Sequence, residues 1–202
     1  MLRARIAVLC SGGGTNLQAL LNAQAAGKLK SGEIILVIAD KAGIGAIERA
    51  KKRGVACSVI PRKEEGFEAR VLEALNDSQI DMVILAGFLG ILSGEFIRDF
   101  GRPIINIHPS LIPSFCGKGF YGLKVHQAAL DYGVKVTGAT VHYVNEIPDG
   151  GKIILQKAVD ILPGDTPEIL QRRVMEQAEW VLLPQAAEIV AAQIVQEKEN
   201  TL

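Results

Sequence analysis

The sequence predicts an α/β protein with a doubly wound, mostly parallel sheet. Up to Phe100, short apolar runs alternate with amphipathic helical segments in four strand–helix units, and a fifth apolar run follows. The pattern then changes to two neighbouring strand-like runs, Val136–Val144 and Ile153–Ala158, which predict an antiparallel hairpin at one edge of the sheet. We find no repeat or linker, and therefore expect one domain over residues 1–202.

The first unit joins a buried strand, Arg5–Cys10, to a helix from about Asn16 to Ala26 through a glycine loop. Gly12, Gly13 and Gly14 allow a ligand to approach the backbone closely, and a helix N-terminus offers free N–H groups to an anion.

The loop does not match other nucleotide-binding motifs. No Lys–Ser/Thr pair follows it, as it would in a P-loop, and Leu17 stands where the third glycine of the dinucleotide fingerprint belongs. A mononucleotide-type phosphate is therefore favoured over NAD. The alternative is a tight turn in which Thr15 or Asn16 caps the helix.

The next three units follow the same order. We expect strands at Glu33–Ala39, Val55–Ile60 and Met82–Ala86, and helices at Gly43–Arg53, at Gly66–Ser78 and from Ser93 onward. Asp40 is expected to cap the second helix rather than to bind a ribose. The charged run Arg62–Glu65 is typical of a solvated face.

The fifth strand, Ile104–Ile107, leads into two polar side chains at alternate positions, Asn106 and His108. Side chains in a strand alternate faces, so these two should project to the same side at the end of the strand, where Pro109 stops it. An imidazole beside an amide suits the stabilisation of an oxyanion. The alternative is a buried histidine with an asparagine that caps a turn.

Three candidate segments follow strand ends: the loop 12–16, the turn 88–92 and the segment 106–113. Ligands in open α/β sheets bind outside the carboxyl ends of the strands, so these segments should meet at one crevice.

The remaining chain predicts a glycine-rich mobile flap at Ser114–Gly122 and a helix at Leu123–Tyr132, in which His126 is a surface or packing residue. A helix should begin with Pro167 in its first turn, and the helical region after it should break near Pro184.

The composition is that of an ordinary globular protein, with 49% hydrophobic and 22% charged residues and a formal net charge of +0. This balance argues against nucleic acid as a partner. We see no apolar run long enough for a membrane and no signal peptide, and three scattered cysteines fit the cytoplasm. We therefore expect small-molecule substrates, no metal, and a monomer or homodimer in the cytoplasm.

The motif Asn106-x-His108-Pro109-Ser110-Leu111-x-Pro113, followed by Asp149-Gly150-Gly151, resembles the folate-dependent formyltransferase family, and the resemblance extends from Arg5 to about Pro184. It implies a Rossmann-like formyltransferase fold and transfer of a formyl group from 10-formyltetrahydrofolate, as co-substrate, to the amine of glycinamide ribonucleotide in de novo purine biosynthesis. It also implies that Asn106, His108 and Asp149 are catalytic.

The resemblance assigns two further sets of residues. Those implied to bind the nucleotide are Gly12, Gly13, Gly14, Thr15, Asn16, Glu176 and Glu179. Those implied to bind folate are Arg62, Lys63, Leu89, Gly90, Ile91, Leu92, Asn106, Asn145 and Asp149. Gly90 stands where the family usually has an arginine, which leaves open whether Arg62, Lys63 or Lys118 holds the acidic tail of folate.

The same sequence motif is compatible with other functions. A methionyl-tRNA formyltransferase would be expected to carry a tRNA-binding domain and a basic surface, and a formyltetrahydrofolate hydrolase an amino-terminal regulatory domain. A catalytically silent nucleotide- or folate-binding module would not need Asn106, His108 and Asp149. A cysteine hydrolase that uses Cys116 with His108 is a weaker alternative.

Overall fold

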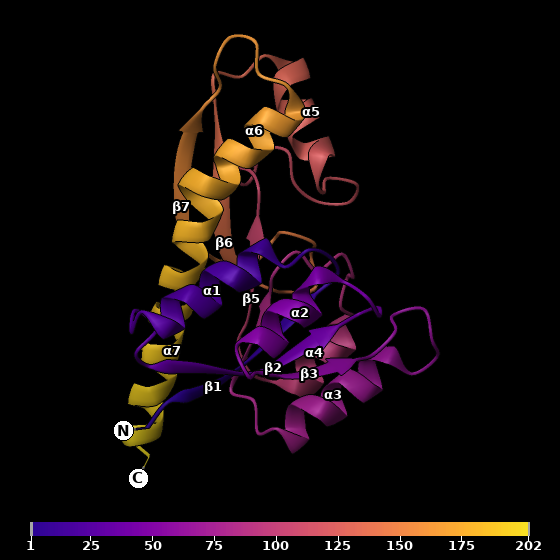
Figure 1. Ribbon diagram of the computed structural model, residues 1–202, viewed down its shortest axis with the longest axis vertical. Coiled ribbons are helices and arrows are strands. Elements are labelled where there is room, and N and C mark those ends of the chain that lie inside the picture. The colour runs from indigo at the N-terminus through magenta and orange to yellow at the C-terminus, as the bar shows by residue number, and fades with distance from the viewer. Residues whose placement is uncertain (1, 202) are drawn as a thin grey trace.

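The computed structural model describes residues 2–201, in which seven strands form one sheet in the order β3-β2-β1-β4-β5-β6-β7 (Figure 1). The strands are β1 Ala4–Cys10, β2 Gly32–Ala39, β3 Ala56–Val59, β4 Met82–Leu85, β5 Ile104–His108, β6 Val136–Tyr143 and β7 Ile153–Asp160. Strands β1 to β5 pair in parallel, whereas β6 is antiparallel to both β5 and β7. The predicted fold class and the antiparallel hairpin at one edge are confirmed.

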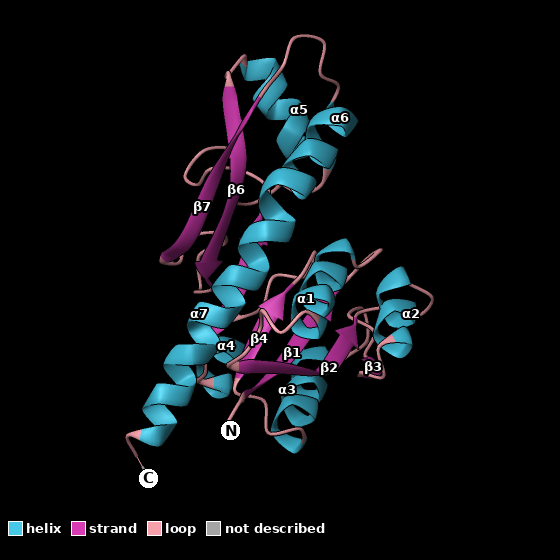
Figure 2. Cartoon of the chain, turned by 60° about the vertical axis from the view of Figure 1, so that its left-hand side comes forward, coloured by secondary structure: helices cyan, strands magenta, loops and turns pink. Residues whose placement is uncertain are grey.

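Helices cover both faces of the sheet (Figure 2). They are α1 Thr15–Ala25, α2 Gly45–Lys52, α3 Phe67–Asp77, α4 Gly94–Phe100, α5 Leu123–Tyr132, α6 Pro167–Val174 and α7 Trp180–Glu199. Apolar side chains of α1, α2 and α7 form one core with the sheet, and those of α3 and α4 form a second core on the opposite face.

Strand β1 shows why the parallel strands read as continuous apolar runs. Ile6, Val8 and Cys10 point into the core beneath α1 and α7, while Ala7 and Leu9 point into the core beneath α3 and α4. Because both faces are covered, neither set of positions can be polar.

The carboxyl-terminal helices depart from the prediction in one respect. Helix α7 runs through Pro184 without a break, so the expected interruption there is wrong. The interruption is a π-helical turn at Met175–Glu179, between α6 and α7. Pro184 lies in the second turn of α7, beyond this segment. The expected proline in the first turn is present in α6, where Thr166 caps the helix.

The capping prediction for Asp40 is wrong. Helix α2 begins at Gly45, its N-cap is Ile44, and no side chain caps it. The first helix likewise has Gly14 as its N-cap without a side-chain cap, so neither Thr15 nor Asn16 has the capping role that the alternative reading gave it. Ser93 does cap α4, with its hydroxyl accepting a hydrogen bond from the amide of Phe96.

The helical run Pro167–Glu199 is long and apolar enough to cross a membrane by length and composition alone, which the sequence reading overlooked. Half of its most apolar window is buried in the protein, however, as in a core helix.

Candidate active site

A cavity of about 610 Å³ opens at the carboxyl ends of β1, β4 and β5. Its walls include Thr15 and Asn16, the turn Phe88–Leu92, and the segment Asn106–Pro109. The structure therefore brings the three segments that were expected to meet into one crevice, because parallel strands end at the same edge of the sheet.

Three side chains form a polar cluster inside this cavity. Asn106 and His108 project from β5, and Asp149 comes from the loop between β6 and β7. Nδ1 of His108 lies 3.5 Å from Oδ2 of Asp149, and the Asn106 amide donates to Oδ1 of Asp149 at 3.5 Å. His108 is only 4% exposed, so the cluster is shielded from bulk water.

The protonation of His108 follows from its partners. Nε2 lies 2.9 Å from the carbonyl oxygen of Phe115, which can only accept, so this nitrogen carries a hydrogen. A second proton would occupy Nδ1, which faces Asp149. Burial lowers the pKa of His108 below its usual value, although the charge of Asp149 and the Phe115 carbonyl act in the opposite direction.

His142 completes the cluster, and the sequence did not single it out. It lies opposite Asn106 in the β5–β6 pairing, and its Nδ1 donates to the Tyr143 carbonyl at 2.8 Å. Its Nε2 lies 3.2 Å from the Asn106 amide nitrogen and 3.6 Å from Oδ1 of Asp149. Only the register of two strands that are distant in the sequence reveals this contact.

Asp149 is held as a carboxylate by its surroundings. Burial alone would raise its pKa, but contacts with His142 and His108 and a 2.8 Å hydrogen bond from the Gly117 amide hold the pKa below its usual value. Its backbone has φ 56°, in the left-handed region that Asp and Asn tolerate better than most residues.

The predicted flap closes one side of the cavity. Residues 117–122 line it, and Phe115 and Gly117 bond to His108 and Asp149 as described above. Phe115 also packs edge-on against Phe120 and Tyr132. The flap is thus anchored to two members of the polar cluster.

The residues implied to bind the nucleotide divide into two groups. Gly12 and Gly13 are exposed but do not line the cavity, whereas Gly14, with φ +73°, packs so closely on α2 that an added Cβ would lie 2.8 Å from Cα of Ala46. Asn16 lies in the cavity wall and donates to Oε2 of the buried Glu179 at 2.6 Å.

Glu179 and Glu176 differ in their environment, although both belong to the π turn. Burial raises the pKa of Glu179, and the hydrogen bond from Asn16 opposes this effect. Glu176 is exposed, pairs with Arg172 at 2.8 Å, and does not line the cavity. The structure instead places Gln171 and Met175 in the wall, which the sequence reading missed.

The residues implied to bind folate lie in the cavity wall, with one exception. Arg62, Leu89, Gly90, Ile91, Leu92 and Asn145 line the cavity, but Lys63 does not. Nη1 of Arg62 donates to the Leu89 carbonyl at 2.7 Å, which fixes the guanidinium over the turn. Leu89 and Ile91 are 52% and 69% exposed and present an apolar rim to a ligand.

Gly90→Arg should weaken the binding of an acidic ligand at this rim rather than strengthen it. A Cβ on Gly90 would lie 2.6 Å from the Phe88 ring, which must shift, and 3.0 Å from Cδ of Arg62, so the new side chain crowds the arginine that already faces this rim. We expect the Kd of 10-formyltetrahydrofolate to rise about threefold or more through the loss of a charge-assisted contact. Calorimetric titration of wild type and variant measures this, and a lower Kd for the variant would contradict it.

His126 of α5 also lines the cavity, and it is a packing residue with 0% exposure. Within residues 2–201, neither of its ring nitrogens has a hydrogen-bond partner. Burial, with a smaller contribution from His108, lowers the pKa of His126 to about 4.

His126→Leu should make the free energy of unfolding less sensitive to acid. The unfolded chain binds a proton at His126 near pH 6.5, whereas the folded chain resists it down to about pH 4. The wild type therefore loses stability as the pH falls between these values, by on the order of 2–3 kcal/mol from this group. Denaturant unfolding at several pH values tests the difference, and parallel curves for wild type and variant would refute it.

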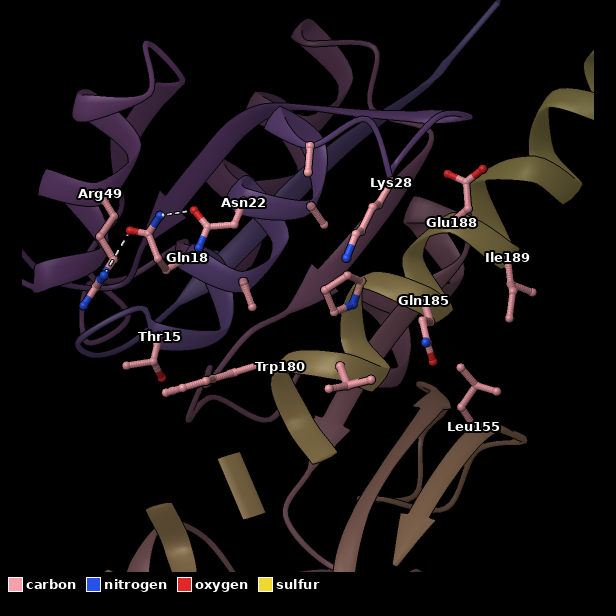
Figure 3. A pocket seen from close by; sticks show the side chains of 15 residues that line it. Thr15, Gln18, Asn22, Lys28, Arg49, Leu155, Trp180, Gln185, Glu188 and Ile189 are labelled. Atoms are coloured by element: carbon pink, nitrogen blue, oxygen red, sulfur yellow. Dashed lines mark hydrogen bonds between the residues drawn. The ribbon is translucent and has the colours of Figure 1, made fainter. Parts of the chain in front are cut away.

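A second hollow, of about 880 Å³, lies between α1 and α7 and contains no member of the polar cluster. Figure 3 shows Gln18 and Asn22 of α1 on one side of it and Gln185 and Glu188 of α7 on the other, with Gln18 bonded to Arg49 and Asn22. Thr15 borders both hollows.

Metal-ligating side chains do not gather anywhere in residues 2–201: no group of three or more His, Cys, Asp or Glu is arranged to hold an ion.

Comparison with known proteins identifies the family. A model of the formyl transferase family matches residues 4–186, and the chain belongs to this family.

Individual curated relatives are similar to the chain over most of its length. The chain is 43% identical over 202 residues to the trifunctional purine biosynthetic protein adenosine-3 of Bos taurus, covering 98% of this chain but 19% of that protein. It is 37% identical over 180 residues to the chloroplastic phosphoribosylglycinamide formyltransferase of Arabidopsis thaliana, covering 87% of this chain and 61% of that protein. The chain thus spans about a fifth of the first of these relatives.

Two solved structures share the fold over nearly the whole chain. Glycinamide ribonucleotide transformylase 1 from Symbiobacterium toebii has a TM-score of 0.87 and 39% identity, covering 95% of this chain and 89% of that one. Phosphoribosylglycinamide formyltransferase from Brucella melitensis has a TM-score of 0.84 and 43% identity, covering 94% of this chain and 96% of that one.

Proposed function

We propose that the chain transfers the formyl group of 10-formyltetrahydrofolate to the amine of glycinamide ribonucleotide, a step of de novo purine biosynthesis. The observation that carries the proposal is one cavity with two sides around the cluster of Asn106, His108 and Asp149. Thr15 and Asn16, which follow the glycine loop, border one side with Glu179, and the Leu89–Leu92 turn with Arg62 borders the other. The names of the relatives and the solved structures support the same reaction.

The glycine loop and Glu179 hold the nucleotide. The exposed backbone of Gly12 and Gly13 at the start of α1 offers N–H groups to the phosphate. Glu179, fixed by Asn16, accepts from hydroxyl or amine groups of the substrate. The nucleotide is then oriented with its amine toward the polar cluster, because the phosphate is fixed at the other end.

The apolar rim and Arg62 hold the folate. The flat pterin and aminobenzoyl groups pack on Leu89 and Ile91, whose exposed apolar surface is otherwise uncovered. Arg62 binds the acidic tail, and Asn145 borders the same wall. The formyl group is left beside His108 and Asn106.

His108 and Asn106 stabilise the charge that develops on the formyl oxygen as the amine attacks. Protonated His108 donates from Nδ1, the nitrogen that faces Asp149, and Asn106 donates from its amide after giving up its long contact with Asp149. Asp149 favours the charged imidazole and accepts a proton released by the amine, directly or through water. The tetrahedral species then collapses: the bond between the formyl carbon and the folate nitrogen breaks, and that nitrogen takes a proton back from Asp149, directly or through water, as tetrahydrofolate leaves. Each oxyanion donor contributes about 3 kcal/mol to the transition state.

The test is folate product formed from 10-formyltetrahydrofolate while glycinamide ribonucleotide is titrated from zero. We expect turnover that depends on the nucleotide and formylated nucleotide in equal amount. Fast turnover that is indifferent to the nucleotide would replace this proposal with hydrolysis. Binding of both ligands without turnover would indicate a silent module.

A further inference from the structure

The carboxylate of Asp40 lies beneath the two loops to which the proposed function assigns the substrates, yet no step of that function uses it. Asp40 follows the last residue of β2 and is 6% exposed. Its Oδ2 accepts a hydrogen bond from the Ser11 hydroxyl at 2.7 Å and lies 3.6 Å from Nε of Arg62. Its Oδ1 is buried and has no hydrogen-bond partner within residues 2–201. A buried acid of this kind requires an explanation.

Ser11 and Arg62, which both contact Asp40, also both bond to the backbone of Leu89. The Leu89 amide donates to Oγ of Ser11 at 2.9 Å, and the Leu89 carbonyl accepts from Nη1 of Arg62 at 2.7 Å. The four residues therefore close a ring. Donor and acceptor are fixed in each of its contacts: the Leu89 amide donates to the Ser11 hydroxyl, the hydroxyl donates to Asp40, and Arg62 donates to the Leu89 carbonyl and faces Asp40 with Nε.

The ring joins the two substrate loops. Ser11 immediately precedes the glycine loop, and its amide donates to the Gly87 carbonyl at 3.2 Å. Leu89 opens the turn that forms the apolar rim of the cavity. Arg62 lines the cavity with its side chain 40% exposed, so its remaining N–H groups are free to meet a ligand.

We propose that Asp40 is a positioning residue which, through Ser11 and Arg62, fixes the Leu89–Leu92 turn and the Arg62 guanidinium for an acidic folate. The inference rests on the proposed function and adds a residue to it. An arginine that is oriented before its ligand arrives binds a carboxylate more tightly, since its conformational freedom is already lost. The charge of Asp40 provides that orientation from the buried side.

Asp40→Asn tests this, because the amide oxygen can still accept from Ser11 while the charge that faces Arg62 is removed. We expect KM for 10-formyltetrahydrofolate to rise about tenfold. KM for the nucleotide and kcat should change by less than about twofold, since the variant leaves the polar cluster intact. In the Arg62→Gln background, Asp40→Asn should raise KM for 10-formyltetrahydrofolate no further, because the two residues act in series.

Asp165→Asn is the matched control, since the side chain of Asp165 is 4% exposed, like that of Asp40, and pairs with an arginine, Arg173, at 2.7 Å, but borders neither hollow. Both KM values should be unchanged in this variant. Equal increases in both KM values for Asp40→Asn, or effects of Asp40→Asn and Arg62→Gln that add, would overturn the inference. Calorimetric Kd values for 10-formyltetrahydrofolate alone test this inference without relying on turnover. An absence of turnover in the wild type would instead refute the proposed function.

Discussion

His108→Ala should lower kcat for formyl transfer by about 10²- to 10³-fold, because a donor to the developing oxyanion is lost. The Kd values of both substrates should stay within about threefold, since the contact with His108 strengthens only as charge develops on the formyl oxygen. Single-turnover rates, together with calorimetric titration of each substrate, separate these two effects.

His108→Gln provides the control for the structural part of the loss. A glutamine side chain reaches about as far as Nε2 of a histidine, so its amide can donate to the Phe115 carbonyl, to which Nε2 of His108 bonds, and preserve the anchor of the flap. It cannot carry the positive charge, and we expect it to be nearly as slow as His108→Ala. A loss that appears mainly in Kd, or recovery of most activity by His108→Gln, would mean that His108 serves the flap rather than the reaction.

Asp149→Asn should fold normally and lower kcat by on the order of 10²-fold or more, because the charge that favours protonated His108 is removed. Asn is nearly isosteric with Asp and tolerates the φ of 56° at this position. Circular dichroism and thermal unfolding should therefore match the wild type. Near-native turnover of the variant over the whole pH range would mean that Asp149 has no catalytic role.

The pH profile of Asp149→Asn gives a second test. Burial holds the His108 pKa below 6.5, and the charge of Asp149 partly offsets this. Without that charge the pKa falls further, so activity that requires protonated His108 should decline at lower pH than in the wild type. A shift of the declining limb toward higher pH would have the wrong sign for this mechanism.

Most of the fold was predicted from the pattern of apolar residues in the strands. Continuous apolar runs predicted buried parallel strands, and alternation at Val136–Val144 predicted the hairpin, because both patterns reflect which faces of a strand are covered. The predictions failed where contacts between distant parts of the chain determine the role of a residue. Asp40 resembles a helix cap in sequence, but its carboxylate bonds to Ser11 from a neighbouring strand end.

The candidate site was predictable only in part for the same reason. The period of β5 places Asn106 and His108 on one face, and their roles stay a prediction until they are tested. The contact of Asn106 with His142 depends on the β5–β6 register across a connection that contains the flap and α5. No local pattern encodes that register, and none distinguishes Arg62, which lines the cavity, from Lys63, which does not.

The π turn at Met175–Glu179 lets the chain accommodate one extra residue between α6 and α7. A π turn holds about one residue more than an α turn, so the five residues here complete roughly the rotation that four complete in an α-helix. Leu170 and Val174 of α6 and Leu183 of α7 therefore face the same core. Deleting one residue within the turn would leave an ordinary α-helix with α6 and α7 in nearly unchanged phase. A deletion elsewhere in α6 or α7 would instead turn the side chains that follow it by about 100° and take them out of the core.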